Sequence, residues 1–238
     1  MKKILIFLVS ITLTFVFISC GDGDNNDNGD DKDEPVTYEE HDYVDLGLPS
    51  GTLWATCNVG ASVPEEYGDY FAWGETKPKK AYNWSTYKWC TPGVNNWFDE
   101  LKKYNTLSET GTVDDKYELD PGDDAAYVNW GPSWRMPTKA QFDELYWRCS
   151  RHWTTRNGVD GMLVTGPNGN TIFLPATGYR YDDKLKDDGF SGYYWSRMIY
   201  TNVPWNGCSE SFNMEKWSWE SYTRDCGFAV RAVRASHN

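Results

Sequence analysis

Cysteine and histidine are the side chains of this sequence with the widest chemistry, since they can act as nucleophiles, metal ligands or redox groups. Their spacing favours none of these roles. The six cysteines form no C-x-x-C pair, and no metal-ligand spacing links His41, His152 and His237. The patterns G-x-S-x-G and H-E-x-x-H do not occur. The sequence therefore predicts no catalytic residue, no metal site and no cofactor, and adjacent acids such as Asp123–Asp124 are expected in solvated turns.

Cys20 differs from the other cysteines because it ends an apolar segment. Two lysines precede an almost unbroken apolar run from Ile4 to Ile18. This run is too short to cross about 30 Å of hydrocarbon, which needs about 20 apolar residues, and its length and flanks are typical of a signal peptide. The sequence Phe17-Ile18-Ser19-Cys20 resembles a bacterial lipobox. The resemblance implies that residues 1–19 are a signal peptide and that Cys20 carries lipid.

Residues 20–40 contain little that could form a core. The segment from Gly21 to Glu34 has no aromatic or β-branched residue and is rich in aspartate. Such a segment stays solvated and extended, so the lipidated cysteine is predicted to be followed by an acidic flexible tether. An acidic stretch directly after a lipidated cysteine also resembles the surface-export signal of Bacteroidetes lipoproteins. That resemblance implies an outer-membrane location facing the cell exterior.

Residues 41–238 are long enough for one well-filled domain. Aromatic residues make up 16% of the chain, with 13 Trp and 16 Tyr, while the mean hydropathy is only −0.68. Large amphipathic rings are therefore expected to fill the core between polar loops. The formal net charge of −12 argues against nucleic acid or an anionic membrane surface as a partner. Contact with a membrane is expected through the lipid anchor only.

The local patterns predict strands and turns with few helices. Thr138 and Gln141 form a capping box, and a helix should follow with one buried stripe. That stripe consists of Phe142, Leu145, Tyr146 and Cys149. Two hairpins are expected, over residues 43–48 with 52–57 and over residues 162–165 with 171–174. Late strands are expected near residues 193–195, 208–214 and 228–234, and long loops over residues 82–124.

Six motifs occur in a characteristic order along the domain. They are Val44–Leu48, Trp54–Ala61, Trp134–Thr138, Asn168–Ala176, Gly192–Ser196 and Gly227–Arg231. The series closely resembles the Fibrobacter succinogenes major paralogous domain, a family common in surface lipoproteins of gut Bacteroidetes and similar to the C-type-lectin fold. The resemblance implies an α+β domain with a small twisted antiparallel sheet, few helices, long loops and neighbouring termini. Trp54, Trp130, Trp134 and Trp195 belong to these motifs or lie beside them and are assigned to the core.

A candidate ligand surface follows from this resemblance. In retroelement-diversified relatives of the fold, the variable ligand surface lies shortly before the terminal G-F strand, which here implies residues 197–224. Large rings alternate there with hydrogen-bonding groups, as a recognition surface requires. The candidate residues are Trp205, Asn206, Glu210, Asn213, Glu215, Trp217, Trp219, Tyr222 and Arg224. Trp217 and Trp219 are expected to share one strand face, either exposed to ligand or buried in the core.

The same motifs suggest disulfides. Cys57 and Cys149 occupy motif positions that could meet near the base of the domain, and a disulfide between them is predicted. Cys208 and Cys226 form a possible second pair across late strands, which leaves Cys90 over.

Three functions remain open. The first is a non-catalytic ligand-binding or adhesion module at the cell surface, with a glycan or a protein as ligand. The second is a structural subunit of a surface complex. The third is an oxidase, because Arg135–Phe142 resembles a segment of formylglycine-generating enzymes. That segment caps a helix, however, and the closely spaced copper-binding cysteines of those enzymes have no counterpart here.

Overall fold

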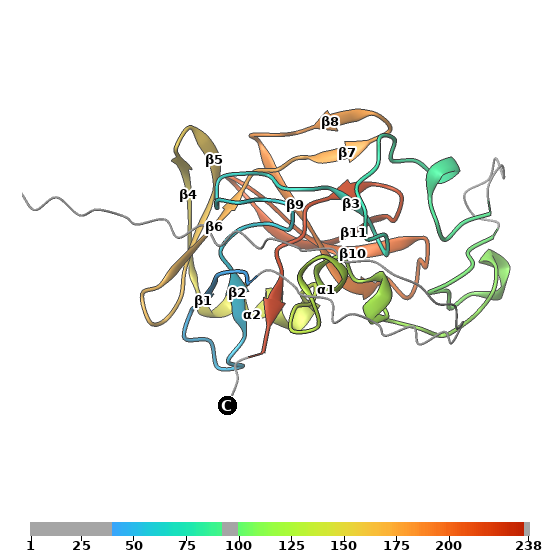
Figure 1. Cartoon of the computed structure of the whole chain (residues 1–238), viewed down its shortest axis with the longest axis horizontal. Coiled ribbons are helices and arrows are strands. Elements are labelled where there is room, and N and C mark those ends of the chain that lie inside the picture. The colour runs from blue at the N-terminus through green and yellow to red at the C-terminus, as the bar shows by residue number, and fades with distance from the viewer. Residues whose placement is uncertain (1–39, 92–99, 236–238) are drawn as a thin grey trace, which may run out of the picture. The chain divides into compact units, whose positions relative to one another are not determined.

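The computed structural model describes residues 40–91 and 100–235, which form antiparallel sheets with two α-helices (Figure 1). This composition fits the predicted α+β class. The predicted signal peptide 1–19, the lipidation site Cys20 and tether residues 20–39 lie outside the described residues. Within the described ranges, no helix has both the length and the apolar character needed to cross a membrane.

The helical elements are short. They are η1 (Trp84–Thr86), η2 (Ser108–Thr110), η3 (Pro121–Asp123), α1 (Ala125–Trp130) and α2 (Lys139–Arg148). The strands are β1 (Tyr43–Asp45), β2 (Leu53–Ala55), β3 (Phe71–Ala72), β4 (Ser150–Arg156), β5 (Val159–Thr165), β6 (Thr171–Pro175), β7 (Tyr179–Tyr181), β8 (Lys184–Lys186), β9 (Ser191–Ile199), β10 (Asn206–Asn213), β11 (Trp217–Thr223), β12 (Gly227–Phe228) and β13 (Val233–Arg234).

The described strands form four sheets. Their orders are β1-β2-β13, β11-β10-β9, β3-β12-β7-β8 and β4-β5-β6. The first and last strands belong to the same sheet, because Trp54 of β2 pairs with Val44 on one side and Val233 on the other. The two ends of the domain therefore meet in one sheet, as the family resemblance implied.

Local sequence rules account for several of these elements. The Thr138 side chain accepts a hydrogen bond from the backbone N–H of Gln141, and Gln141 Oε1 accepts one from the backbone N–H of Thr138 at 2.9 Å. The predicted capping box therefore begins α2. Both expected hairpins are present as β1–β2 and β5–β6. The expected late strands correspond to parts of β9, β10, β12 and β13. The sequence patterns did not predict α1, β3, β4, β7 or β8.

Aromatic residues fill the core, as the composition predicted. Trp195 and Phe228 stack with ring centroids 4.0 Å apart in the largest cluster of buried residues. A second cluster lies between α2 and the sheets and contains Trp54, Phe142 and Leu145. The assignment of Trp54, Trp130, Trp134 and Trp195 to the core is confirmed, since at most 6% of each is exposed.

The predicted disulfide between Cys57 and Cys149 is absent. All five cysteines in the described part of the chain are free, buried thiols. Cys57 packs in the cluster around Trp195 and lies 3.2 Å from the Ala61 carbonyl oxygen, whereas Cys149 packs in the cluster beneath α2. Both thiols are therefore buried in the core, but they lie in different clusters and do not meet. The suggested pair of Cys208 and Cys226 is not formed either.

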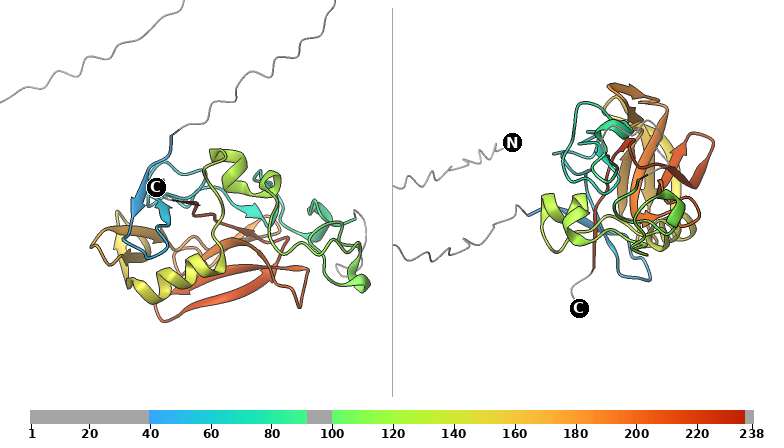
Figure 2. Two further views of the ribbon diagram at one scale, coloured as in Figure 1. Left: turned by 90° about the horizontal axis from the view of Figure 1, so that it is seen from below. Right: turned by 90° about the vertical axis from the view of Figure 1, so that its right-hand side faces the viewer.

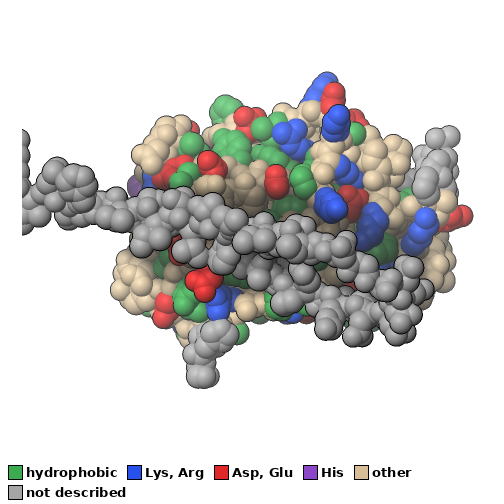
Figure 3. Space-filling model, in the orientation of Figure 1, with side chains coloured by type: hydrophobic (Ala, Val, Ile, Leu, Met, Phe, Trp, Pro, Cys, Tyr) green, Lys and Arg blue, Asp and Glu red, His purple; other side chains and the backbone are tan. Residues whose placement is uncertain are grey.

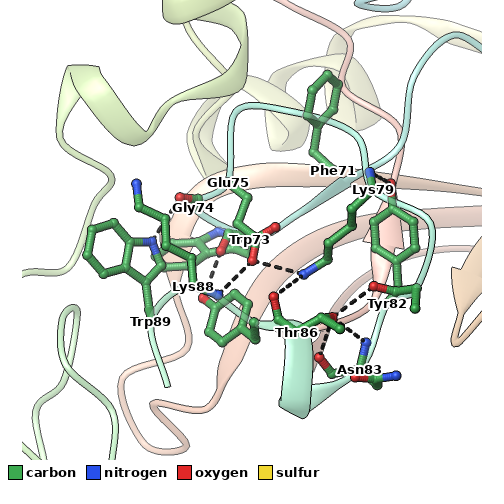
Figure 4. A network of polar contacts seen from close by, with 12 residues as sticks. Phe71, Trp73, Gly74, Glu75, Lys79, Tyr82, Asn83, Thr86, Lys88 and Trp89 are labelled. Carbon is green, nitrogen blue, oxygen red and sulfur yellow. Dashed lines mark hydrogen bonds and ion pairs between the residues drawn. The ribbon is translucent and has the colours of Figure 1, made fainter. Parts of the chain in front are cut away.

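Hydrogen bonds hold the described parts of the long loops that the sequence predicted over residues 82–124, namely residues 82–91 and 100–124. Figure 4 shows the network around Glu75, whose Oε1 accepts from Lys79 Nζ at 2.9 Å and from the Lys88 amide at 2.8 Å. Asp123 and Asp124 are buried, contrary to the expected solvated turn. Asp123 accepts hydrogen bonds from two lysines and a tyrosine, and Asp124 caps α1. Side-chain hydrogen bonds and ion pairs hold these loops, in contrast to the backbone hydrogen bonds that hold the strands of a sheet.

Candidate functional site

The sheet β11-β10-β9 has two faces of different chemistry. Successive side chains of a strand point to opposite faces, and the strand register fixes which residues share a face. On one face, Tyr194, Glu210 and Trp219 lie side by side across the three strands. On the other face, Tyr193, Ser211 and Ser218 do so.

The first face packs on the interior of the domain. Figure 2 shows α2 lying along this sheet, and Phe142 of α2 lies 6.4 Å from Trp219 between ring centroids. Trp217 stacks on Phe212 at 5.0 Å. Trp217 and Trp219 are both half-buried against the same core cluster. The prediction that they share a face is confirmed, and the structure places that face against the core.

Two of the predicted ligand residues are buried. Glu210 lies on the core face with 3% of its surface exposed, and Arg224 is completely buried. The Arg224 guanidinium donates hydrogen bonds to the carbonyl oxygens of Lys103, at 3.0 Å, and Tyr104. Arg224 therefore ties β11 to a distant loop. Neither side chain is accessible to a ligand in this structure.

The opposite face opens into a small polar groove of about 150 Å³. The groove is lined by residues of this face and of the adjoining turn, namely Ser191, Tyr193, Ser211, Asn213, Lys216, Ser218, Glu220 and Tyr222. Phe212, whose ring stacks on Trp217 on the core face, borders it as well. The other end of this face is covered, because Trp195, two residues beyond Tyr193 on β9, belongs to the main core cluster. Of the predicted ligand residues, Asn213 and Tyr222 line the groove.

Glu220 is the centre of the groove's hydrogen bonds. Its Oε1 accepts from Ser218 Oγ at 2.7 Å and pairs with Lys216 Nζ at 2.9 Å, and its Oε2 accepts from the Tyr222 hydroxyl at 3.0 Å. Burial alone would raise the pKa of Glu220, but these three donors outweigh it and hold the pKa below its ordinary value. The groove thus contains an ionised carboxylate beside a cation at neutral pH.

Two tyrosine rings form the wall of the groove. Tyr193 and Tyr222 meet edge to face with centroids 5.5 Å apart. Burial, followed by the neighbouring Tyr193 and Glu220, raises the pKa of the Tyr222 hydroxyl, so it remains a hydrogen-bond donor. Ser211 and Ser218 add hydroxyls within 3.4 Å of each other. Rings and hydroxyls therefore lie within one small recess.

The remaining predicted site residues lie at the margins. Trp205 and Asn206 are half-buried at the start of β10, and Asn206 Nδ2 donates to Ser221 Oγ at 3.2 Å. Glu215 is exposed in the β10–β11 turn, where its amide donates to Asn213 Oδ1 at 2.8 Å. Asn213 therefore shapes the turn as well as lining the groove. Apolar Phe190 and Met214, each at least 70% exposed, adjoin the groove residues Ser191 and Asn213.

Seven groove residues are absent from the predicted ligand residues, namely Ser191, Tyr193, Ser211, Phe212, Lys216, Ser218 and Glu220. The signal that could have found them is the period-2 alternation of polar residues along three neighbouring strands. Comparison with models of protein families, with curated proteins and with solved structures gave no match. Among the described residues, no three His, Cys, Asp or Glu side chains are grouped so that they could hold a metal ion.

Proposed function

We propose that this chain is a lipid-anchored outer-membrane protein with a C-type-lectin-like domain that faces the cell exterior and binds a ligand without catalysis. The apolar run ending at Cys20 supports the anchor. The six ordered motifs and the pairing of the first and last strands through β2 are compatible with that fold. The groove on β11-β10-β9 supports the binding role.

A glycan is the ligand that this groove favours. Sugars present many hydroxyls and an apolar ring face, and they need both hydrogen-bonding groups and aromatic surface from a protein. The Lys216–Glu220 pair supplies a charged donor and acceptor next to two serine hydroxyls, and Tyr193 and Tyr222 supply aromatic surface. This combination in a recess of about 150 Å³ carries the proposal.

Substitutions in the groove are expected to weaken glycan binding without loss of the fold. The full chain in neutral detergent would be applied to a glycan array and a protein array, and Glu220→Gln and Tyr222→Phe compared with wild type on the best ligand. Truncating a central contact typically costs about 2 kcal/mol or more, which is roughly 30-fold in Kd. Glu215→Gln, in the exposed turn, should bind as wild type does.

Trp219→Ala provides the opposite control. Its ring packs on Phe142, so this variant should have a lower melting temperature than wild type. The free energy of unfolding should fall by about 2–4 kcal/mol, less than for a fully buried Trp because this ring is half-buried. Undiminished glycan binding by both groove variants would reject the groove as the site.

The anchor is tested separately. Cys20→Ala should abolish metabolic labelling with fatty acid and leave an unprocessed or released protein, because two or more acyl chains are needed for stable anchoring. A variant that stays as firmly membrane-bound and as short as wild type would contradict the lipoprotein assignment.

An assembly role in a surface complex is the second candidate. The observation that favours it is Trp147 on α2, which is 75% exposed beside a recess that also involves Pro49 and Ala140. Exposed aromatic surface of this kind often marks a protein contact. Absence of glycan binding together with co-purification of neighbouring envelope proteins, lost in Trp147→Ala, would favour this role over the first.

A further inference from the structure

A second recess lies away from the groove, between the loop of residues 68–82 and strand β7. It has a volume of about 380 Å³. Its lining consists of Gly68, Asp69, Tyr70, Pro78, Lys79, Lys80, Tyr82 and Arg180. Figure 3 shows Lys and Arg side chains gathering on this side of the domain, over β3, β7 and β8. Such a gathering is notable in a chain with a formal net charge of −12.

Two of the cations in this recess have no carboxylate partner. Arg180 is half-buried, and its guanidinium lies 5.1 Å from the centroid of the Tyr70 ring. Within the described residues, neither Arg180 nor exposed Lys80 makes an ion pair or a side-chain hydrogen bond. Asp69 is the one carboxylate in the lining. The lining therefore contains three cationic side chains and one carboxylate.

Lys79 is engaged elsewhere. Its ammonium lies 2.9 Å from Glu75 Oε1 and donates to the Thr86 carbonyl oxygen at 3.1 Å, as Figure 4 shows. Its charge is thus matched by the buried Glu75. Arg180 and Lys80 remain as the two groups that could bind an incoming anion.

The walls of the recess are fixed by hydrogen bonds. The Tyr82 hydroxyl donates to the Tyr70 carbonyl oxygen at 2.6 Å and accepts from the Lys79 amide at 3.2 Å, and the Tyr70 hydroxyl donates to the Thr177 carbonyl oxygen. Arg180 sits in the middle of β7, between β12 and β8. A preformed site of this kind loses little conformational freedom when it binds.

We propose that this recess binds an oxyanion through the Arg180 guanidinium and the Lys80 ammonium. The planar guanidinium can donate two parallel hydrogen bonds to a sulfate, phosphate or carboxylate group, and it makes no hydrogen bond to another described residue that would compete. Lys80, which is exposed, adds a second positive charge. This site is independent of the ligand in the groove on β11-β10-β9.

The test is an NMR titration of the full chain in neutral detergent with sodium sulfate, at constant ionic strength set by chloride. Amides of residues 68–70 and 79–82 and the Arg180 Nε–H signal should shift saturably. Parallel titrations with phosphate and with acetate distinguish tetrahedral from planar oxyanions. Arg180→Gln should weaken binding about tenfold or more, Lys80→Ala less, and Lys184→Ala, on exposed β8 outside the recess, should have no effect.

Each outcome decides the proposal. Saturable shifts that need about tenfold more anion or more in Arg180→Gln, with an unchanged melting temperature and an intact Lys184→Ala response, support the site. Shifts that do not saturate for any of the three anions, or that saturate in Arg180→Gln at the wild-type anion concentration, overturn it. Equal weakening by Lys184→Ala also overturns it, because that result would show a general charge effect.

Discussion

Arg231→Ala is expected to lower the free energy of unfolding by about 3–5 kcal/mol, a large part of the 5–15 kcal/mol typical of a folded domain. The Arg231 side chain is completely buried. Its guanidinium donates to Asn58 Oδ1 at 2.8 Å, to the Phe173 carbonyl oxygen at 2.9 Å and to the carbonyl oxygens of Ala55 and Thr56 at 3.2 Å. Removing it leaves these acceptors buried without a donor.

Arg231→Lys should be nearly as damaging. A lysine ammonium offers its three donors from one nitrogen and cannot reach acceptors on β6 and on residues 55–58 at once. Arg148→Ala, at an exposed position of α2, is the matched control and should change stability by about 0.5 kcal/mol or less. Denaturant unfolding measures all three variants. A wild-type midpoint for Arg231→Lys would contradict the assigned role.

Glu210→Gln is expected to stabilise the protein at alkaline pH. Burial, followed by the charge of Asp143, raises the pKa of Glu210 to about 8, although Trp217, Lys139 and Arg151 oppose this shift. The folded protein therefore holds the Glu210 proton at pH values where the unfolded chain has lost it. Stability contributed by this group is complete below about pH 4.5 and is lost as pH rises towards 8.

The size of the effect follows from the shift. As pH rises from the ordinary carboxyl pKa to about 8, the free energy of unfolding falls by about 2–5 kcal/mol. Because Gln resembles the protonated carboxyl, Glu210→Gln should match wild type near pH 4 and exceed it by that amount near pH 9. Unfolding curves measured from pH 4 to pH 9 test this.

Glu220→Gln supplies the control of opposite sign. The pKa of Glu220 lies below its ordinary value, so its contribution is present above the unfolded-state pKa and is lost as pH falls through the folded-state pKa. Replacing it should cost a little stability at neutral pH and nothing at strongly acidic pH. A Glu210→Gln variant whose difference from wild type is constant across the pH range would show that Glu210 does not titrate as described.

Elements set by local rules could be predicted from the sequence. The capping box of Thr138 and Gln141 and the turn at Asn168-Gly169 act over a few residues, and both appear where expected. Strand β4 could not be recognised in the same way, because its residues are half-exposed and show no clear alternation. Pairings such as Trp54 with Val233 depend on the whole chain and leave no local signal.

The groove overlaps the predicted segment 197–224, but most of its lining residues differ from the predicted ligand residues. Trp217 and Trp219 were predicted because of their large rings. Side chains alternate between the two faces along β11, and this alternation places Ser218, Glu220 and Tyr222 together on the open face. Glu210 and Arg224 were predicted as ligand residues because they carry hydrogen-bonding groups within the segment 197–224. Their burial depends on partners far away in sequence, such as the Lys103 carbonyl oxygen for Arg224.

The position of β13 also bears on when the domain can fold. Strand β2, near the start of the domain, is complete only when β13, among its last residues, pairs with it. Arg231, shortly before β13, fastens the same early segment. Pairing between segments so far apart in sequence slows folding, because a long loop must close before the contacts form. For a chain exported as proposed here, slow folding lengthens the time during which the polypeptide can cross the inner membrane unfolded.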